Sequence, residues 1–251
     1  MAPTRRTALI AGVFFVLTFI SSITAVALYA PLLGHPGYVL GAGADTQIAW
    51  GALCEIVLGI TNIGTAVVLY PVVRRQSESI ALGYVASRIV ESVLIAVGIL
   101  SLLSVTTLRQ AFAAAPGGDA GSFLVAARSL LALHDWTFLL GPGLLAGFGN
   151  GLLLGYLMYR SRLVPRGMAL IGLIGGPLVF LSGIGVLFGL HEQSSVTSAI
   201  ATAPEFVWEA ALGIWLIAKG FRPAGVAALE GAGRVAPDVP AGVRSGSGTT
   251  L

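Results

Sequence analysis

The sequence predicts an all-α membrane protein: a bundle of six transmembrane helices followed by a disordered C-terminal tail. Three observations support this fold class. Hydrophobic residues make up 56% of the 251 residues and charged residues only 10%, whereas soluble domains carry roughly 25% charged residues. The mean hydropathy is +0.90. Several apolar runs are each long enough to cross about 30 Å of hydrocarbon as a helix.

The predicted spans follow one another through mostly short connections. We place the six spans at residues 8–30, 48–70, 79–103, 136–158, 167–190 and 204–221. The first run also resembles a secretory signal peptide, because the basic start MAPTRR precedes an apolar stretch and 25–27 (AVA) fits a cleavage site. We favour a retained span, since the apolar residues continue to Ala30 and are numerous enough to cross the bilayer.

The cations between the spans predict the orientation, because Lys and Arg resist translocation across the membrane. Of the 14 Lys and Arg residues, 11 fall on one side: Arg5, Arg6, Arg74, Arg75, Arg160, Arg162, Arg166, Lys219, Arg222, Arg234 and Arg244. Only Arg109 and Arg128 fall on the other side. We therefore expect a multi-pass protein of the cell membrane with both termini in the cytoplasm. Because the cations lie beside apolar segments, they indicate the orientation of the spans. We therefore expect no nucleic-acid partner.

Two longer connections and the tail complete the chain. Residues 31–47 and 105–135 lie on the outer side of the predicted bundle. In the second connection, SFLVAARSLLALHDW follows a turn-rich break and is expected to form a short interfacial helix before span four. We assign 1–222 to the transmembrane domain. Residues 223–251 are rich in small residues, Pro and Gly, which predicts a disordered cytoplasmic tail.

Glycine spacing in the fourth span predicts close helix packing. Four glycines recur there at intervals of four: Gly143, Gly147, Gly151 and Gly155. They share one helix face, along which a second backbone can approach closely. Asn150 flanks this face and could hydrogen-bond across it. The sequence leaves open whether this glycine stripe packs within the chain or against a partner.

Charged residues inside the spans form the candidate site. Arg88 and Glu91 are three residues apart in span three, so they are neighbours on one helix face and can pair. An unpaired charge at the bilayer centre costs about 2.5–3.5 kcal/mol on insertion scales. Glu55 in span two and Glu209 in span six fall in the same outer half of the membrane, and we expect one of them to help neutralise Arg88.

Two interpretations of these charges remain open. They form either a structural network that fixes helix register, as in an accessory membrane subunit, or a polar pocket that binds or passes a small ligand or lipid head group. The residues of the hypothetical pocket are Arg88, Glu91, Glu55, Glu209, His134 and Asp135. The accessory alternative predicts that every buried acid is satisfied and that a partner binds the glycine stripe.

His134 and Asp135 precede Trp136 at the predicted mouth of span four. Asp135 could orient His134 for acid–base chemistry, as in an intramembrane hydrolase. We favour a simpler interpretation, with Asp135 capping a helix N-terminus and Trp136 at the interface, because adjacent helical residues diverge by about 100°.

Sequence motifs of common enzyme classes are absent, namely H-E-x-x-H, G-x-S-x-G and the P-loop. The single cysteine, Cys54, excludes an intrachain disulfide. We expect no metal and no cofactor, and a protein that is not an enzyme.

Four segments share their pattern with a known family: NIGTAVVLYPVVRRQSESIALGYVASRIVES (62–92), HDWTFLLGPGL (134–144), GYLMYRSRLVPRGMALIGLIGGPL (155–178) and WEAALGIWLIAKGF (208–221). Together they resemble the bacterial integral-membrane proteins grouped as domain-of-unknown-function family 4386. The resemblance covers roughly residues 8–222. It implies a six-span membrane protein, and it implies no activity, ligand or catalytic residue.

Overall fold

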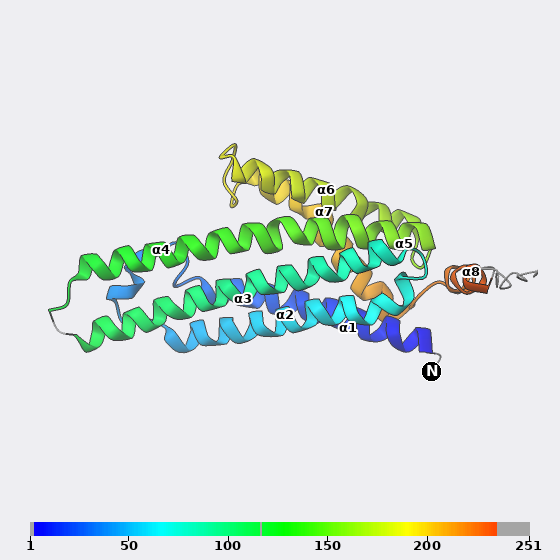
Figure 1. Cartoon of the computed structure of the whole chain (residues 1–251). Coiled ribbons are helices and arrows are strands. Elements are labelled where there is room, and N and C mark those ends of the chain that lie inside the picture. The colour runs from blue at the N-terminus through cyan, green and yellow to red at the C-terminus, as the bar shows by residue number, and fades with distance from the viewer. Residues whose placement is uncertain (1–2, 116, 235–251) are drawn as a thin grey trace, which may run out of the picture.

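Helices account for all the regular structure in the computed structural model, which describes residues 3–115 and 117–234 (Figure 1). The long helices are α1 (Pro3–Tyr29), α2 (Asp45–Val73), α3 (Glu78–Ala114), α4 (Ala120–Phe138), α6 (Arg166–Leu187) and α7 (Val196–Ala218). The shorter elements are η1 (Pro36–Leu40), η2 (Leu139–Leu145), η3 (Gly147–Leu154), α5 (Gly155–Ser161) and α8 (Pro223–Arg234). The segments from α4 to α5 follow one another as a single continuous rod.

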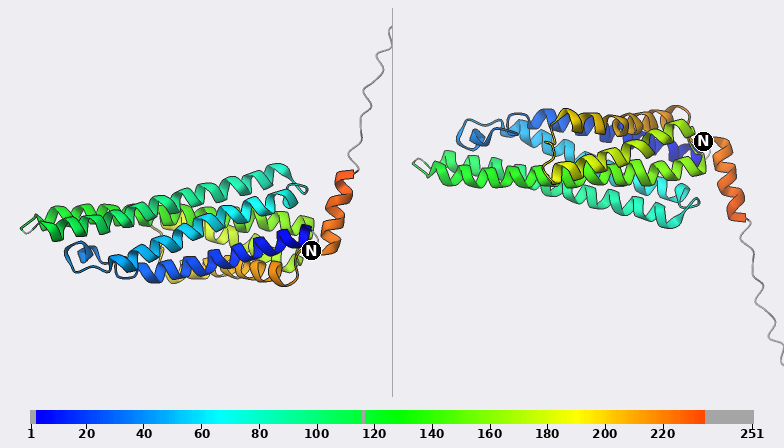
Figure 2. Two further views of the ribbon diagram at one scale, coloured as in Figure 1. Left: turned by 90° about the horizontal axis from the view of Figure 1, so that it is seen from below. Right: turned by 90° about the horizontal axis from the view of Figure 1, so that it is seen from above.

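The predicted six-span fold class is confirmed. Six helical rods are long and apolar enough to cross a membrane, with α4 to α5 counting as one rod from Ala120 to Ser161. The N-terminal end of α1 and the helix α8 lie at the same end of the bundle, which we call the terminal end (Figure 1). The opposite end carries the turn between α3 and α4, and we call it the hairpin end. α1 packs between α2 and α7, so it is part of the bundle (Figure 2).

The α3–α4 hairpin is longer than a bilayer requires. α3 has 37 residues, which correspond to about 55 Å of helix, against about 30 Å of hydrocarbon. By contrast α6 has 22 residues, and the hairpin extends well past α6 and α7 (Figure 1). The extension is tied to the loop before α2, because Asp45 accepts hydrogen bonds from Arg109 Nε at 2.7 Å and from the Tyr38 hydroxyl at 2.8 Å.

The expected short interfacial helix before span four is not a separate element. Its residues form the first part of α4, which runs into the span without a break. The reason is packing: Ala127 and Leu131 are buried against Leu102 and Val105 of α3, so the segment continues the hairpin. Asp119 caps the helix by accepting a hydrogen bond from Gly121 N at 3.0 Å. The helix therefore starts well before Asp135, and the predicted cap at Asp135 is wrong.

The fourth rod widens near its middle into π-type turns, over Leu139–Leu145 and again over Gly147–Leu154. Pro142 lies in the first of these segments and has no N–H to donate along the helix. Such wide turns are rare and are often found at functional sites. They place the glycine stripe and the residues before it beside α6.

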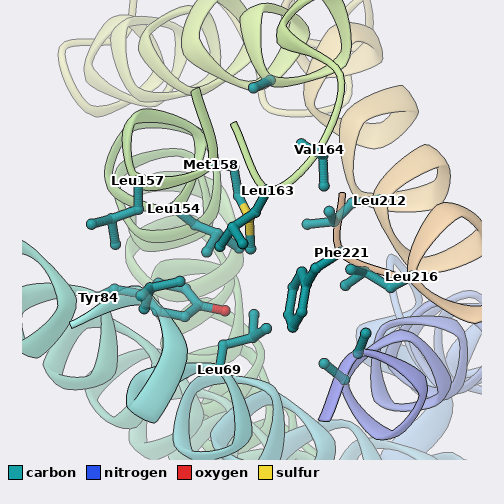
Figure 3. Packing of buried hydrophobic residues seen from close by; sticks show 14 of the residues in the cluster. Leu69, Tyr84, Leu154, Leu157, Met158, Leu163, Val164, Leu212, Leu216 and Phe221 are labelled. Atoms are coloured by element: carbon teal, nitrogen blue, oxygen red, sulfur yellow. The ribbon is translucent and has the colours of Figure 1, made fainter. Parts of the chain in front are cut away.

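Apolar side chains close the bundle at the terminal end. Figure 3 shows this cluster, in which Leu69, Tyr84, Leu157, Leu212 and Phe221 pack together from different parts of the chain. All of these side chains are buried. The cluster holds the helix ends together beneath the charged residues described below.

The first part of the segment predicted as a disordered tail is helical. α8 covers Pro223–Arg234 and runs across the end of the bundle (Figure 2). It is attached to the bundle because Arg222 N donates to Leu163 O at 2.8 Å and Leu229 is buried. Proline at the first helical position suits a helix start. Residues 235–251 of the predicted tail lie outside the described residues.

Candidate functional site

Arg88 is held by side chains from two helices. It is only 1% exposed, and its Nη1 donates to Glu91 Oε2 at 2.7 Å. Its Nη2 donates to Asn62 Oδ1 on α2, and Asn62 Nδ2 in turn donates to Glu91 Oε1 at 3.2 Å. The predicted pairing of Arg88 with Glu91 is confirmed, and the three side chains close a ring of hydrogen bonds between α2 and α3.

The expected second acidic partner does not contact Arg88 directly. Neither Glu55 nor Glu209 pairs directly with the guanidinium. Glu55 instead accepts a hydrogen bond from the hydroxyl of Tyr29 on α1 at 2.9 Å. Asn62 is the second partner of Arg88 instead, because it lies on the face of α2 that contacts α3, two turns from Glu55. Asn62 was not predicted as a partner, because an uncharged amide gives no hydropathy signal of a charge partner.

Glu209 is bound by the fourth rod. Asn150 in η3 donates a hydrogen bond from Nδ2 to Glu209 Oε1, and its backbone oxygen accepts one from Trp208 Nε1 at 3.1 Å. Asn150 is fully buried. The predicted hydrogen bond from Asn150 across the glycine face is therefore confirmed, and its acceptor lies on α7.

Glu205, like Asn62, is a site residue that was not predicted from the sequence. It lies four residues before Glu209, so the two carboxylates share one face of α7. This four-residue spacing was the sequence signal that could have identified Glu205. The residue was overlooked because span six was placed at 204–221, which put Glu205 at the outer edge of the span, whereas α7 begins at Val196. Glu205 is 4% exposed, and neither carboxylate oxygen has a hydrogen-bond partner in the described part of the chain.

These polar groups line a cavity of about 450 Å³ between α1, α2, α3, η2, α6 and α7. Its polar floor comprises Glu55, Asn62, Arg88, Glu91, Glu205 and Glu209. Its walls are mostly apolar and include Leu58, Ile95, Phe138, Leu139, Val179 and Phe206. Ile23 and Val26 of α1 and Phe206 of α7 also line it and are exposed. The cavity thus reaches the surface of the bundle between α1 and α7.

The glycine stripe packs inside the chain. A Cβ on Gly147 would lie 2.7 Å from the backbone oxygen of Gly176 on α6, and one on Gly155 would lie 3.2 Å from Leu173 N. Gly151 lies directly against Gly176 as well. Gly143 has no such contact with α6 and lines the cavity instead. Three of the four glycines thus join the fourth rod to α6, and the first leaves space for the cavity.

His134 and Asp135 lie outside the lining of the cavity. His134 is buried beside Gly98 and faces the ring of Tyr29, with centroids 6.3 Å apart. Asp135 points outward, with 71% of its side chain exposed. Neither residue lines the cavity. Their mutual contact, 3.5 Å from His134 Nδ1 to Asp135 Oδ1, is longer than a good hydrogen bond, so the geometry gives the hydrolase alternative no support.

Groups suited to a metal ion are absent from the described residues, because no three His, Cys, Asp or Glu side chains come together as ligands. Cys54 is a free, half-buried thiol.

Comparison with known proteins identifies a family for the chain. No curated protein and no solved structure matches the chain. The family described as a domain of unknown function (DUF4386) matches residues 10–220, most of the chain. This match agrees with the resemblance noted in the sequence, and the protein, whose chain has six candidate membrane spans, belongs to this family of unknown function.

Proposed function

We propose that this protein binds a small amphiphilic molecule in the cavity above Arg88. The observation that carries the proposal is the cavity itself, which combines a cluster of charged groups with a mostly apolar lining. Ligand sites typically measure about 300–1,000 Å³ and combine apolar walls with a few polar groups that orient the ligand. A molecule with one polar end and an apolar body matches this arrangement.

The route into the cavity supports an amphiphile. The surface between α1 and α7 where the cavity emerges is formed by Ile23, Val26 and Phe206. In a bilayer this apolar surface faces lipid, so a molecule dissolved among the acyl chains can enter sideways between the two helices. The polar head group then reaches the charged floor while the apolar body stays near the walls.

We place the protein in the cell membrane with the terminal end in the cytoplasm. The support is the distribution of cations, because most of the Lys and Arg residues outside the spans lie at the terminal end and only Arg109 and Arg128 lie towards the hairpin end. The entrance between α1 and α7 then opens towards the outer half of the membrane.

A purely structural or accessory role has weaker support. That role predicts that every buried acid is satisfied, whereas both oxygens of Glu205 lack a partner in the described part of the chain. It also predicts that the glycine stripe is free for another protein, whereas Gly147, Gly151 and Gly155 already contact α6. Both observations favour the pocket.

The proposal is tested by the reactivity of a cysteine placed in the cavity. Ser182 lines the cavity, and Ser104 is an exposed serine on α3 that does not. In a Cys54→Ser background in lipid nanodiscs, we expect Ser182→Cys to react with neutral methyl methanethiosulfonate and saturating 2-phenylethanol to slow this reaction. The same additive should leave Ser104→Cys unchanged. An unreactive Ser182→Cys, or equal effects at both positions, would overturn the proposal.

A further inference from the structure

Glu205 is the least satisfied charged group of the cavity. It is 4% exposed, lines the cavity, and has no hydrogen-bond partner for either oxygen in the part of the chain that the structure describes. One of these oxygens lies directly against Gly151 of the glycine stripe, where any side chain would collide with it. The absence of a side chain at this position therefore leaves room for the carboxylate. A buried carboxylate without a partner either holds a proton or binds a cation.

The charges around Glu205 favour a cation over an anion. Four acids line the cavity: Glu55, Glu91, Glu205 and Glu209. Arg88 is the one cation among the described residues that line it, and its two terminal nitrogens are already bound by Glu91 and Asn62. Arg88 Nε has no partner, but an anion that reached it would lie among the carboxylates and be repelled by them.

The walls add a preference for an organic cation. The rings of Phe138 and Phe206 line the cavity, and aromatic faces attract ammonium groups through their quadrupole. A bare metal ion would gain nothing from these walls and would find no set of three clustered ligands among the described residues. An ammonium group on an apolar body satisfies the floor and the walls together.

We propose that the cavity binds an amphiphilic organic cation whose ammonium group is held between Glu205 and Glu209. This inference rests on the proposed function, because it assumes that the cavity takes a ligand, and adds the charge of that ligand. Glu205 supplies two buried acceptor oxygens that have no hydrogen-bond partner in the described part of the chain, and its side chain turns towards the cavity when the ligand binds. Glu209 supplies the one that Asn150 does not bind.

Three probes that share a phenyl ring and a two-carbon chain test the sign of the charge: phenethylammonium, 2-phenylethanol and 3-phenylpropionate. Each is used at pH 7 to slow the reaction of Ser182→Cys with methyl methanethiosulfonate. We expect phenethylammonium to act at about tenfold lower concentration than 2-phenylethanol, since a charge-assisted hydrogen bond adds roughly that much affinity. The carboxylate probe should be the weakest.

Two matched variants test whether Glu205 causes the advantage of the ammonium probe over the neutral probe. Glu205→Gln should reduce the advantage of the ammonium to about twofold, because a neutral amide removes the charge assistance. Glu192→Gln, at an exposed glutamate outside the cavity, should preserve it. If Glu205→Gln lowers the melting temperature sharply, Glu209→Gln provides the second test and should also reduce the advantage.

The outcomes separate this inference from the proposed function. If 2-phenylethanol protects Ser182→Cys as well as phenethylammonium does, the cation proposal is wrong and the pocket remains. If Ser182→Cys does not react at all, the pocket itself is wrong. A comparison of nanodiscs made of phosphatidylglycerol with nanodiscs rich in phosphatidylethanolamine identifies the source of the ammonium. If phosphatidylethanolamine competes with phenethylammonium for the cavity, the ammonium comes from a lipid head group. If phenethylammonium protects Ser182→Cys equally in both kinds of nanodisc, the ammonium comes from a free amine.

Discussion

At the scale of single residues, the burial of Arg88 is explained by a closed ring of hydrogen bonds. Glu91 supplies the opposite charge from one turn along α3, and Asn62 binds both Arg88 and Glu91 from α2. The ring replaces the water that the guanidinium and the carboxylate lose on burial. It also fixes the register of α2 against α3, because sliding either helix would separate the amide from its two partners.

Glu91→Gln should therefore destabilise the protein strongly. The substitution leaves the Arg88 charge buried without its hydrogen-bonded partner charge, and breaking a buried ion pair in this way costs about 3–5 kcal/mol. Denaturation with sodium dodecyl sulfate in mixed micelles measures the loss. Glu55→Gln is the matched control, because the Tyr29 hydroxyl can donate to an amide oxygen as it does to the carboxylate, and its midpoint should change little. Equal midpoints for both variants and the wild type would contradict the structural role of the ring.

The site residues differ in how far the sequence could predict them. Arg88 and Glu91 are three apart on one helix, so local spacing was enough to predict their contact. Asn62 and Glu205 reach the site from other helices, and no local rule gives the rotation of α2 or α7 about its axis. Glu205 also depended on the start of α7, which hydropathy alone placed too late.

At the scale of elements, the contact between the fourth rod and α6 depends on glycine at positions where backbones touch. Gly147 lies so close to α6 that an added Cβ would stand 2.7 Å from the backbone oxygen of Gly176 and 3.1 Å from the Cβ of Val179. A backbone oxygen cannot rotate away as a side chain can. The wide turn of η2 forms one wall of the cavity, and this close contact holds the fourth rod against α6.

Gly147→Ala should therefore separate the two helices and destabilise the protein by about 1–3 kcal/mol, the usual cost of overpacking. Gly59→Ala on α2 is the control, because its added Cβ would meet only Ser92, at 3.9 Å. There the substitution should be neutral or stabilise by up to about 1 kcal/mol, since alanine loses less backbone entropy in a helix. Midpoints of thermal unfolding compare the two. A stable Gly147→Ala variant would show that the contact is looser than described.

The glycine stripe and the α3–α4 hairpin show what spacing predicts and what it leaves open. Four-residue spacing predicted a close-packed face on the fourth rod, but the identity of α6 as its neighbour required the whole fold. The hairpin was predicted only up to the membrane boundary. Hydropathy marks the part of a helix in lipid, whereas the extension beyond it is held by contacts such as those of Ala127 and Leu131 with α3.

At the scale of the whole molecule, the length of the α3–α4 hairpin and the distribution of Lys and Arg distinguish the two ends of the bundle. The hairpin end extends past a bilayer thickness and carries few cations, whereas the terminal end is bordered by the basic connections at 74–75 and 160–166. Translocating the hairpin end moves two cations across the membrane, and translocating the terminal end would move many more. This distribution supports the proposed orientation, in which the hairpin end lies outside the cell.

Two serines near helix starts test this direction. Ser122 lies at the start of α4 at the hairpin end, and Ser79 lies at the start of α3 at the terminal end; both are exposed. In a Cys54→Ser background, a membrane-impermeant maleimide should label Ser122→Cys in intact cells and label Ser79→Cys only after permeabilisation. The reverse pattern would contradict the orientation. It would also turn the entrance between α1 and α7 towards the cytoplasmic half of the membrane, so that any amphiphile would have to reach Glu205 from the inner leaflet.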